Sequence, residues 1–450
     1  MGLFGTLIAS TGALRVFEKA LEVSQNNVSN ASTPGYAKQR LLIESLPFDP
    51  ERQLPGGVLS GGTQGFRDPY AEQAVWRRQQ DYGLSEQLVS QLNRLEPYFD
   101  VTGEAGIPGA LNRFFQSVSA WSVAPNDTAT RGAVIEQADY LAARVRDAAT
   151  GLVSARTEAQ QQIGNTVESI NNLAGLVRDL NAQIRQDYRL SDDPGFDARL
   201  HTVLEELAEY VDFTTLRQSD GSVTLLMGGQ VPLVVGDRQY QIEASVAGDT
   251  VAILDADGAD VTARVSRGRL GGLLDYRNST LPELESGLDL LASTLADRVN
   301  AVLASGVDLN GQPGAALFTC DGATGAALTL RLTSISAEEL AGAVPASPGG
   351  NANVLNLLAL AGAGEIGGAT FTQHYAALAR RVGRAVQTAR EDLTTNQQLL
   401  LQARALREEI SGVSLDEEAA RLVEFQRAYQ ASARLVTVLN ELTEIAVNLV

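Results

Sequence analysis

Few side chains in this sequence are of the types that usually carry catalysis or bind metal ions. Its 450 residues include one cysteine, Cys320, and two histidines, His201 and His374, which lie far apart in the chain. A single cysteine excludes an intramolecular disulfide and a cysteine cage for a metal ion, and two distant histidines exclude a histidine-rich metal site. A serine-histidine-aspartate triad is not favoured, because no G-x-S-x-G motif accompanies either histidine. We therefore predict no metal, no cofactor and no enzymatic activity.

One pair of adjacent carboxylates could act as a general acid and base. Glu417 and Glu418 provide such a pair, and paired carboxylates are common in enzymes that transfer protons. However, the segment from Ser414 to Glu417 has the pattern of a capping box, which places both glutamates in the first turn of a helix. Acidic side chains stabilise that end of a helix through its dipole. We therefore interpret the pair as structural.

The sequence also contains one glycine-rich motif. Gly362, Gly364 and Gly367 match G-x-G-x-x-G and lie shortly before a helix predicted from Phe371. A dinucleotide site needs a strand before this loop and a parallel strand after the helix. Because the helix from Phe371 leads into another helix, we interpret the glycines as a linker.

The charge and hydropathy of the chain exclude several classes of binding partner. Its formal net charge is −19, which opposes binding to nucleic acid and to anionic membrane surfaces, so neither is predicted as a partner. No stretch approaches the roughly 18 unbroken apolar residues of a membrane helix. Met1 to Ser10 lacks the basic start of a cleavable signal peptide, so secretion would need another route.

A chain of this length exceeds one compact core, and about two to four domains are expected.

Both ends of the chain are predicted to be helices with a narrow apolar seam. In the first helix, from Leu3 to about Asn30, the seam residues recur every seven positions: Leu7, Leu14, Leu21 and Val28. In the last helix, which starts at the capping box, they follow spacings of three, four and seven: Leu422, Phe425, Tyr429, Val436 and Leu439. A narrow seam needs a helical partner, so we predict that the two helices pair as a coiled coil. The alternative is that both helices cover the main domain.

The chain between these helices is predicted to be mainly α, as an elongated helical bundle that carries a small antiparallel β unit. Apolar residues at helical spacing indicate helices at 70–99, 111–121, 128–187, 200–211, 272–304, 353–361 and 371–410. Where the period changes to two, short strands are predicted at 223–227, 231–235, 240–244, 251–254 and 261–265, with isolated strands at 41–43 and 328–332. Pro34 and Gly35 favour a type II turn after the first helix, and the glycine-rich residues 55–65 are predicted to be flexible.

These elements divide the chain into successive parts. We predict an N-terminal helix and connector at 1–65, a long helical bundle at 66–212, a β unit at 213–268, a helical return at 269–318, a short variable region at 319–370, a bundle helix at 371–410, and a C-terminal helix at 411–450 that pairs with the N-terminal helix.

The residues around the end of the first helix form a specific motif, which consists of Asn26, Asn27, Asn30, Thr33, Pro34, Gly35 and Tyr36. The segment from Ala20 to Tyr36 resembles the N-terminal signature of flagellar axial proteins, the group of rod, hook and hook-associated proteins. The match is long, but it indicates only this larger group.

The C-terminal segment narrows the resemblance. Residues 411–420, which include Asp416 and Glu417, and residues 425–434 are very similar to the corresponding segment of bacterial flagellar hook-associated proteins of the FlgK type. Residues 271–277 and 308–311 resemble the same family. On the N-terminal motif alone, another axial protein, such as a hook, rod or flagellin-like protein, remains the alternative. Only these motifs argue against a coiled-coil adaptor unrelated to flagella.

The resemblance implies a structural subunit of the hook–filament junction. It implies export through the flagellar type III apparatus without a cleavable signal peptide, and hence an extracellular place in the bacterial flagellum. The subunit is expected to assemble as a ring on the hook tip, with the paired terminal helices forming an inner tube. Expected partners are further copies of the chain, the hook protein below, a second junction protein or the filament side above, and an export chaperone. The variable region is short for the family, so an outer domain is expected to be reduced.

Overall fold

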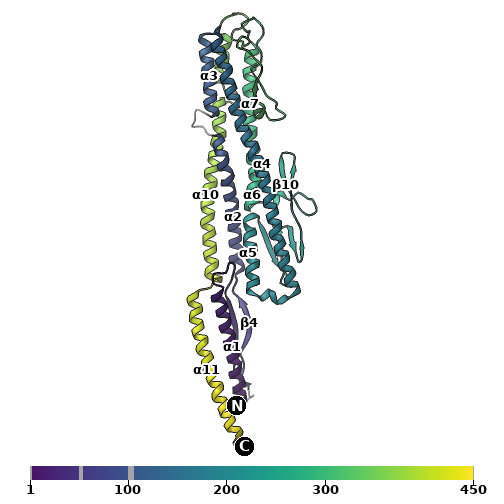
Figure 1. The fold of residues 1–450 in the computed structure, drawn as a ribbon, viewed down its shortest axis with the longest axis vertical. Helices are drawn as coiled ribbons and strands as arrows, with labels where there is room; N and C mark the ends of the chain where they lie inside the picture. Colours follow the sequence, from purple (N-terminus) through teal and green to yellow (C-terminus); the bar gives the residue numbers. More distant parts are fainter. Residues whose placement is uncertain (1–2, 50–53, 100–105, 449–450) are drawn as a thin grey trace.

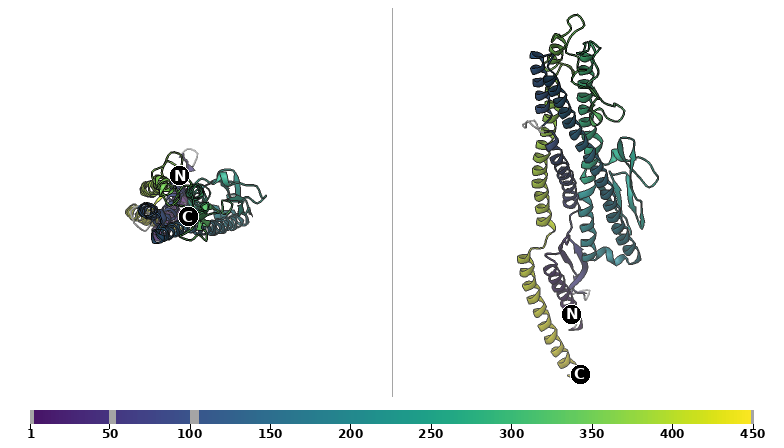
Figure 2. Two further views of the ribbon diagram at one scale, coloured as in Figure 1. Left: turned by 90° about the horizontal axis from the view of Figure 1, so that it is seen from above. Right: turned by 45° about the horizontal axis from the view of Figure 1, so that its top comes forward.

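The computed structural model describes residues 3–49, 54–99 and 106–448. Its helices run mainly along one long axis, which gives the molecule the shape of a rod (Figure 1). The terminal helices α1 (Leu3–Ser29) and α11 (Leu415–Asn448) extend from the lower end, so both ends of the chain lie there (Figure 2). The other long helices form the body of the rod.

Apart from the short α8, which was not predicted, each of these helices overlaps a helix predicted from the apolar spacing of the sequence. They are α2 (Pro69–Leu95), α3 (Ile107–Val123), α4 (Thr128–Gln186), α5 (Pro194–Tyr210), α6 (Gly268–Asp275), α7 (Leu281–Ala304), α8 (Ala326–Thr329), α9 (Ala352–Ala359) and α10 (Phe371–Ser411). The single helix predicted at 272–304 is in fact divided, because a π-helical turn, Tyr276–Thr280, joins α6 to α7. No helix in the described residues is long and apolar enough to cross a membrane. The predicted fold class, mainly α with a small antiparallel β part, is confirmed.

Side-chain caps determine where several of the long helices begin. Asp127 accepts a hydrogen bond from a backbone amide in the first turn of α4, and Asp68 does the same for α2. A complete capping box formed by Thr370 and Gln373 starts α10. Because the first amides of a helix lack partners within it, such a cap stabilises the helix by roughly 1 kcal/mol.

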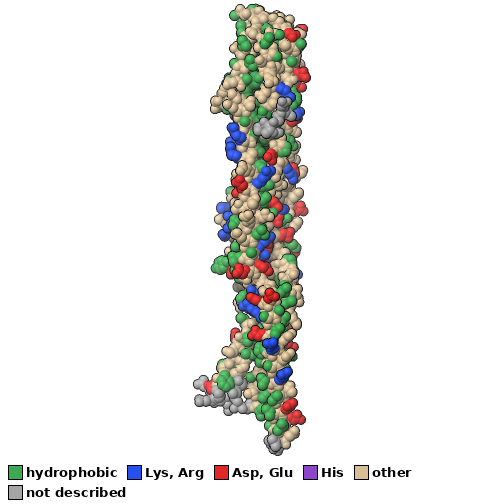
Figure 3. Space-filling view, turned by 90° about the vertical axis from the view of Figure 1, so that its left-hand side faces the viewer, with side chains coloured by type: hydrophobic (Ala, Val, Ile, Leu, Met, Phe, Trp, Pro, Cys, Tyr) green, Lys and Arg blue, Asp and Glu red, His purple; other side chains and the backbone are tan. Residues whose placement is uncertain are grey.

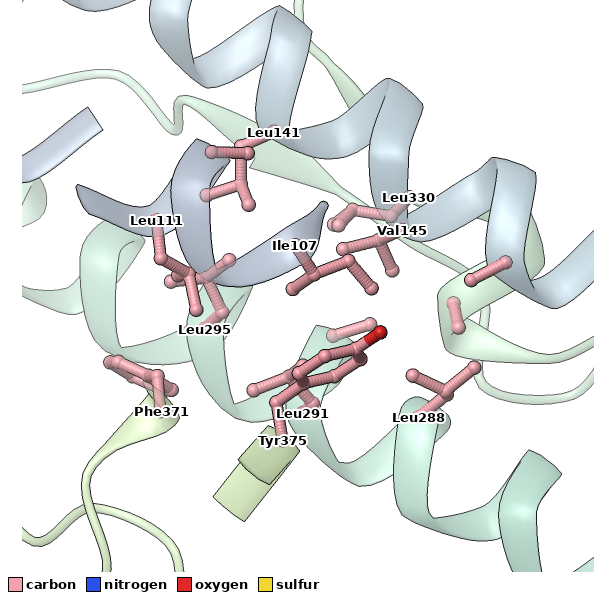
Figure 4. Packing of buried hydrophobic residues seen from close by; sticks show 14 of the residues in the cluster. Ile107, Leu111, Leu141, Val145, Leu288, Leu291, Leu295, Leu330, Phe371 and Tyr375 are labelled. Carbon is pink, nitrogen blue, oxygen red and sulfur yellow. The ribbon is translucent and has the colours of Figure 1, made fainter. Parts of the chain in front are cut away.

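The upper part of the body encloses a hydrophobic core. Residues of α3, α4, α7 and α10 converge there, and Figure 4 shows Leu111, Leu141 and Leu295 close together, with Phe371 at the edge of the group. Trp121 of α3 is completely buried in the same core. The antiparallel helices of the bundle are therefore held together mainly by apolar burial.

A second core lies in the lower part of the body. The later half of α4 contributes Ile163, Ile170 and Val177, and α5 and α6 pack against them with residues such as Leu207 and Leu270. The 59 residues of α4 thus contribute to both cores.

The β unit consists of two small sheets beside α4 (Figure 1). The antiparallel sheet β5-β6-β7-β8 contains β5 (Phe213–Arg217), β6 (Val223–Met227), β7 (Val231–Val235) and β8 (Arg238–Gln239). A separate hairpin pairs β9 (Glu243–Ala247) with β10 (Thr250–Leu254).

Two strands of this unit, β5 and β8, were not predicted, and two strand predictions are wrong in detail. The strand expected at 240–244 begins instead at Glu243. The strand expected at 261–265 is largely a 3-10 turn, Thr262–Arg264. There, the carboxylate of Asp260 accepts hydrogen bonds from the amide (2.9 Å) and hydroxyl (2.5 Å) of Thr262, a local pairing that competes with strand formation.

Asparagine side chains fasten several extended segments to the helices. In each case the side chain of one asparagine forms two hydrogen bonds with the backbone of one other residue. Its NH2 group donates to the carbonyl oxygen of that residue, and its oxygen accepts from the backbone N–H of the same residue, as a neighbouring strand would. The pairs are Asn27 with Gln39, Asn171 with Ile242, Asn181 with Val223, Asn278 with Val251 and Asn300 with Phe318. We call these five pairs the asparagine clamps. They satisfy backbone groups that would otherwise lie unpaired beside a helix.

Residues 306–370 cover the top of the body with little regular structure. A two-residue strand pair, β11 (Phe318–Thr319) with β12 (Arg331–Leu332), replaces the longer strand predicted at 328–332, because α8 occupies Ala326–Thr329. The buried side chain of Arg131 anchors this region by donating hydrogen bonds to the carbonyl oxygens of Leu340 (2.5 Å) and Ala337 (3.3 Å).

The glycine-rich residues 55–65, which were predicted to be flexible, belong to a β-hairpin. In it, β1 (Gln39–Ser45) pairs antiparallel with β4 (Val58–Gly65), and β2 (Phe48–Asp49) pairs with β3 (Leu54–Pro55). The hairpin packs along α1, where a side chain at Gly57 would come within 3.3 Å of Ala9. We call α1, this hairpin and α11 the terminal unit, and residues 69–411 the body.

Candidate functional site: the terminal helical pair and its joint with the body

The two terminal helices pack against each other, as the sequence predicted (Figure 1). The predicted seam residues of α11 lie on its less exposed face, where all five are half-buried and flank the buried Ser432: Leu422, Phe425, Tyr429, Val436 and Leu439. On α1, Leu7, Leu14 and Leu21 are also half-buried, but Val28 is 38% exposed. The role of these residues in assembly stays a prediction.

The most buried residues of α1 form a different stripe from the predicted one. They are Val16, Ala20, Ser24 and Asn27, at spacings of four, four and three. Small and polar side chains dominate this stripe, so a search for large apolar residues does not detect it. Small residues allow close packing, here against neighbouring segments of the terminal unit.

A second apolar stripe on α11 remains exposed in the single chain. Leu435, Val438, Leu442 and Ile445 are between 46% and 56% exposed, and their spacings of three, four and three place them on one face, next to the seam. Close by, an open groove of about 460 Å³ is lined by apolar residues of both termini, including Phe4 and Val447. This stripe was not predicted, although its helical spacing is visible in the sequence.

The polar residues of the N-terminal motif form one hydrogen-bonded cluster at the end of α1. Asn27, which is fully buried, holds the backbone of Gln39 and accepts a hydrogen bond from the Tyr36 hydroxyl (2.9 Å). Asn30 donates to the side chain of Asn26 (2.7 Å), and Thr33 donates to Asn30. Burial, together with the negative charge of Glu418, raises the pKa of Tyr36 to about 12. The raised pKa means that the hydroxyl stays protonated, and can donate to Asn27, to a higher pH than an exposed tyrosine would.

The residues Thr33 to Tyr36 form the predicted type II turn, which we call the signature turn. The amide of Tyr36 donates to the carbonyl oxygen of Thr33 (3.2 Å), and Gly35 has a φ of +73°. The turn touches the body: a Cβ at Gly35 would lie 2.6 Å from the carbonyl oxygen of Ala198 and from the hydroxyl of Thr202. Glycine is therefore required here for two reasons, the positive φ and the close approach.

Arg67 links the signature turn to two helices of the body. Its guanidinium group donates to the carbonyl oxygen of Gly35 (2.5 Å), to the carboxylate of Glu72 in α2 (2.5 Å) and to that of Asp197 in α5 (2.6 Å). The side chain is only 12% exposed. Such charge-assisted hydrogen bonds with a fixed fork geometry position the partners precisely relative to each other. No motif in the sequence indicated this role for Arg67.

A larger charged cluster continues from Arg67 into the body. Glu72, which is 1% exposed, lies 3.4 Å from Arg407 of α10 and 3.7 Å from the imidazole of His201. Burial of Glu72 favours its neutral form, but His201, Arg67 and Arg407 together outweigh that effect and lower the pKa of Glu72 to about 2. Arg407 also binds Glu205 of α5 (2.6 Å). The cluster therefore ties α2, α5 and α10 together where they meet the terminal unit.

The elbow between α10 and α11 completes the joint. The carbonyl oxygen of Ser411 accepts a hydrogen bond from the amide of Lys38 (2.8 Å). Ser414 accepts from the amide of Glu417 (3.4 Å), which agrees with the predicted helix start. Asp416 and Glu417 are exposed in the first turn of α11, and Glu417 lies 4.0 Å from Arg40 of the hairpin.

The residues considered for chemistry do not form a catalytic or metal site in the described part of the chain. His201 stacks on Trp76 within the joint, with ring centroids 5.6 Å apart, whereas His374 lies within 3.0 Å of the carbonyl oxygen of Gly287. Cys320 is half-buried, and no cluster of potential metal ligands occurs among the described residues. The glycine motif at 362–367 follows α9 and not a strand.

Comparison with known proteins gives a consistent result. Residues 92–318 match the family described as the flagellar hook-associated protein FlgK helical domain, and residues 405–449 match the flagellar basal body rod FlgEFG protein C-terminal family. Flagellar hook-associated protein 1 of Bacillus subtilis is 25% identical, over 97% of this chain and 96% of that protein. The protein of the same name from Salmonella typhimurium is 26% identical, over 68% of this chain and 58% of that protein.

A solved structure has a similar fold. The flagellar hook junction protein FlgK from Burkholderia pseudomallei superposes with a TM-score of 0.68, and the match covers 76% of this chain and all of that structure. With 17% sequence identity, this likeness concerns the fold.

Proposed function

The chain belongs to the family of flagellar hook-associated proteins FlgK, and from this premise we propose that it is a subunit of the hook–filament junction that assembles as a ring on the hook tip. The family establishes a structural role in the bacterial flagellum, not an enzymatic one. The match to the rod-protein family is restricted to the C-terminal helices. It therefore favours the FlgK assignment over the alternative of a hook or rod protein.

The exposed apolar stripe of α11 carries this proposal. In the single chain, α1 covers the seam of α11 but leaves Leu435, Val438, Leu442 and Ile445 largely exposed to solvent. Contiguous apolar side chains on an isolated helix are typical of a surface that another protein covers. In a ring, the stripe would pack against the terminal helices of the neighbouring copy, and the predicted seam would hold each pair together.

The shape of the molecule supports the same arrangement. The terminal unit projects from one end of the rod-shaped body (Figures 1 and 3). Copies that stand side by side could therefore form an inner tube from their terminal units and an outer layer from their bodies. The ring would contact the hook protein on one side and a second junction protein or the filament on the other. Export by the flagellar type III apparatus, with the help of a chaperone, would bring the subunit to this extracellular place.

Substitution of one stripe residue tests the proposal. Leu442→Asp places a charge in the stripe, and Thr437→Asp places the same charge on the exposed polar face of α11 as a matched control. In a strain that lacks the native gene, we expect Leu442→Asp to be secreted but to leave cells without filaments, with flagellin released into the medium. Thr437→Asp should restore motility. Normal filaments in the Leu442→Asp strain would contradict the assignment of the stripe to a subunit interface.

A further inference from the structure

The connection between the terminal unit and the body is narrow. The backbone passes from one to the other at residues 66–68 and again at 412–414, next to the elbow. Apart from these crossings, contacts between the two parts are made by the signature turn on α5, by the amide of Lys38 with Ser411, by Arg67, and by β4 with the 3-10 turn Tyr188–Asp192. Neither hydrophobic core of the body includes a residue of α1 or α11. The two parts are therefore not joined by a shared core.

A cleft that is partly open to solvent separates the two parts on one side of the joint. It has a volume of about 530 Å³, and it is lined by Gln39 and Thr63 of the hairpin and by Trp76, His201 and Thr215 of the body. The terminal unit thus has room to move toward the body on this side, while the signature turn holds it on α5.

We propose that the joint is a hinge with two states, and that the contact of Arg67 with Gly35 holds it in the state seen here. When that contact is present, the signature turn lies against Ala198 and Thr202, and the terminal unit has a fixed direction relative to the body. When it is broken, the terminal unit turns as one rigid part about residues 66–68 and 412–414. This inference does not depend on the proposed ring.

The geometry of Arg67 supports this role. Its guanidinium group bonds to Glu72 and Asp197, which both belong to the body, so the arginine remains ordered whether or not Gly35 is in place. The bond to the carbonyl oxygen of Gly35 is the one that crosses to the terminal unit. A few polar contacts, with no apolar core behind them, can be exchanged for water at low cost, which is the property that a hinge contact needs.

A distance measurement in the purified full-length chain tests the proposal. With Cys320 replaced by serine, spin labels at Gln397→Cys in α10 and Thr437→Cys in α11 report the distance between the two parts. We expect one narrow distribution for the otherwise native chain. Arg67→Ala should broaden and shift it, and Gly35→Ala should do the same, because a methyl group there cannot fit against α5.

Arg404→Ala is the matched control. Arg404 belongs to the same charged cluster but binds Glu205 and Gln79, which lie in the body, so its loss should leave the distribution narrow. The proposal is overturned if the Arg67→Ala and Gly35→Ala distributions superimpose on the native one, or if Arg404→Ala broadens it equally. If Arg67→Ala does not fold, Gly35→Ala decides the question alone.

Discussion

Asn27 and Gln39 are joined by two hydrogen bonds, 2.8 Å and 2.9 Å long, through which a side-chain amide takes the place of a neighbouring strand. Asn27 is fully buried at the end of α1, and Gln39 is the first residue of β1. The clamp thereby holds the hairpin on α1 and sets the position of the signature turn between them. An asparagine suits this point of the motif because its side chain carries an NH2 donor group and a carbonyl acceptor side by side.

We expect Asn27→Ala to release the start of β1. The substitution leaves the amide and carbonyl groups of Gln39 without partners in a buried place, at a cost on the order of 2 kcal/mol or more. Hydrogen exchange should then become faster at residues 38–42, while the amides of α4 keep their protection. Asn30→Ala, which removes only bonds near the end of α1, is the control. Unchanged exchange at Gln39 would show that the clamp contributes nothing to this segment.

Glu72 should make stability depend on pH in the acid range. Its pKa in the folded chain is lowered to about 2, from an ordinary value of 4.5. The stabilisation that the ionised carboxylate of Glu72 gives to the folded chain is therefore fully present above about pH 5, and it is lost as the pH falls toward 2. We expect Glu72→Gln to lower the free energy of unfolding at neutral pH by at most on the order of 3 kcal/mol. Its acid denaturation curve should be flatter between these pH values than that of Glu18→Gln, a change at an exposed site on α1.

Phe425→Asp should separate the terminal helices without unfolding the body. A charge buried between two helices costs several kcal/mol, but neither core of the body contains a residue of α11. Calorimetry of the purified variant should give a near-normal melting temperature, whereas cells that carry it should lose motility and release flagellin. Phe425→Leu keeps an apolar seam and should behave normally. A melting temperature lowered by many degrees in Phe425→Asp would mean that α11 packs on the body's own core.

The isolated chain should lose its terminal helices first under limited proteolysis. Only Glu418 and Ser432 are buried among the described residues of α11, a helix of 34 residues, so this helix gains little from burial in the single chain. Such a helix can be paired most of the time and still open in a small fraction of molecules, and this fraction is enough for a protease to cleave it. We expect a resistant fragment of roughly residues 70–405. Protection of residues 3–29 under conditions that cleave exposed loops of the body would refute this expectation.

The long elements could be predicted from the sequence because their apolar residues repeat at a constant period. The helix expected from Thr128 to Asp187 is found at Thr128–Gln186, and the pairing of the first and last helices follows from their narrow seams. Over such lengths, the cumulative periodicity outweighs any local preference. Short strands lack this advantage, and for that reason β5 was missed and residues 261–265 were assigned wrongly.

The joint could not be predicted, because its contacts connect residues far apart in the sequence. Arg67 meets Asp197 across 130 positions and Gly35 across 32, and neither spacing leaves a periodic pattern. The asparagine clamps have the same property, since a single polar residue in a helix usually indicates only a solvent-exposed position. The signature turn was recognised from its residue types, but its contact with α5 required the structure.

The continuity of α4 through both cores has a mechanical consequence. Apolar residues from Val134 to Ala159 belong to the upper core and those from Ile163 to Ile184 to the lower one, with no break in the helix between them. A helix of this length spans about 90 Å, so a load applied at one end of the body is carried along a single hydrogen-bonded backbone to the other. The body should therefore resist bending as a stiff strut, and deformation should concentrate where α4 is absent, at residues 66–68 and 412–414.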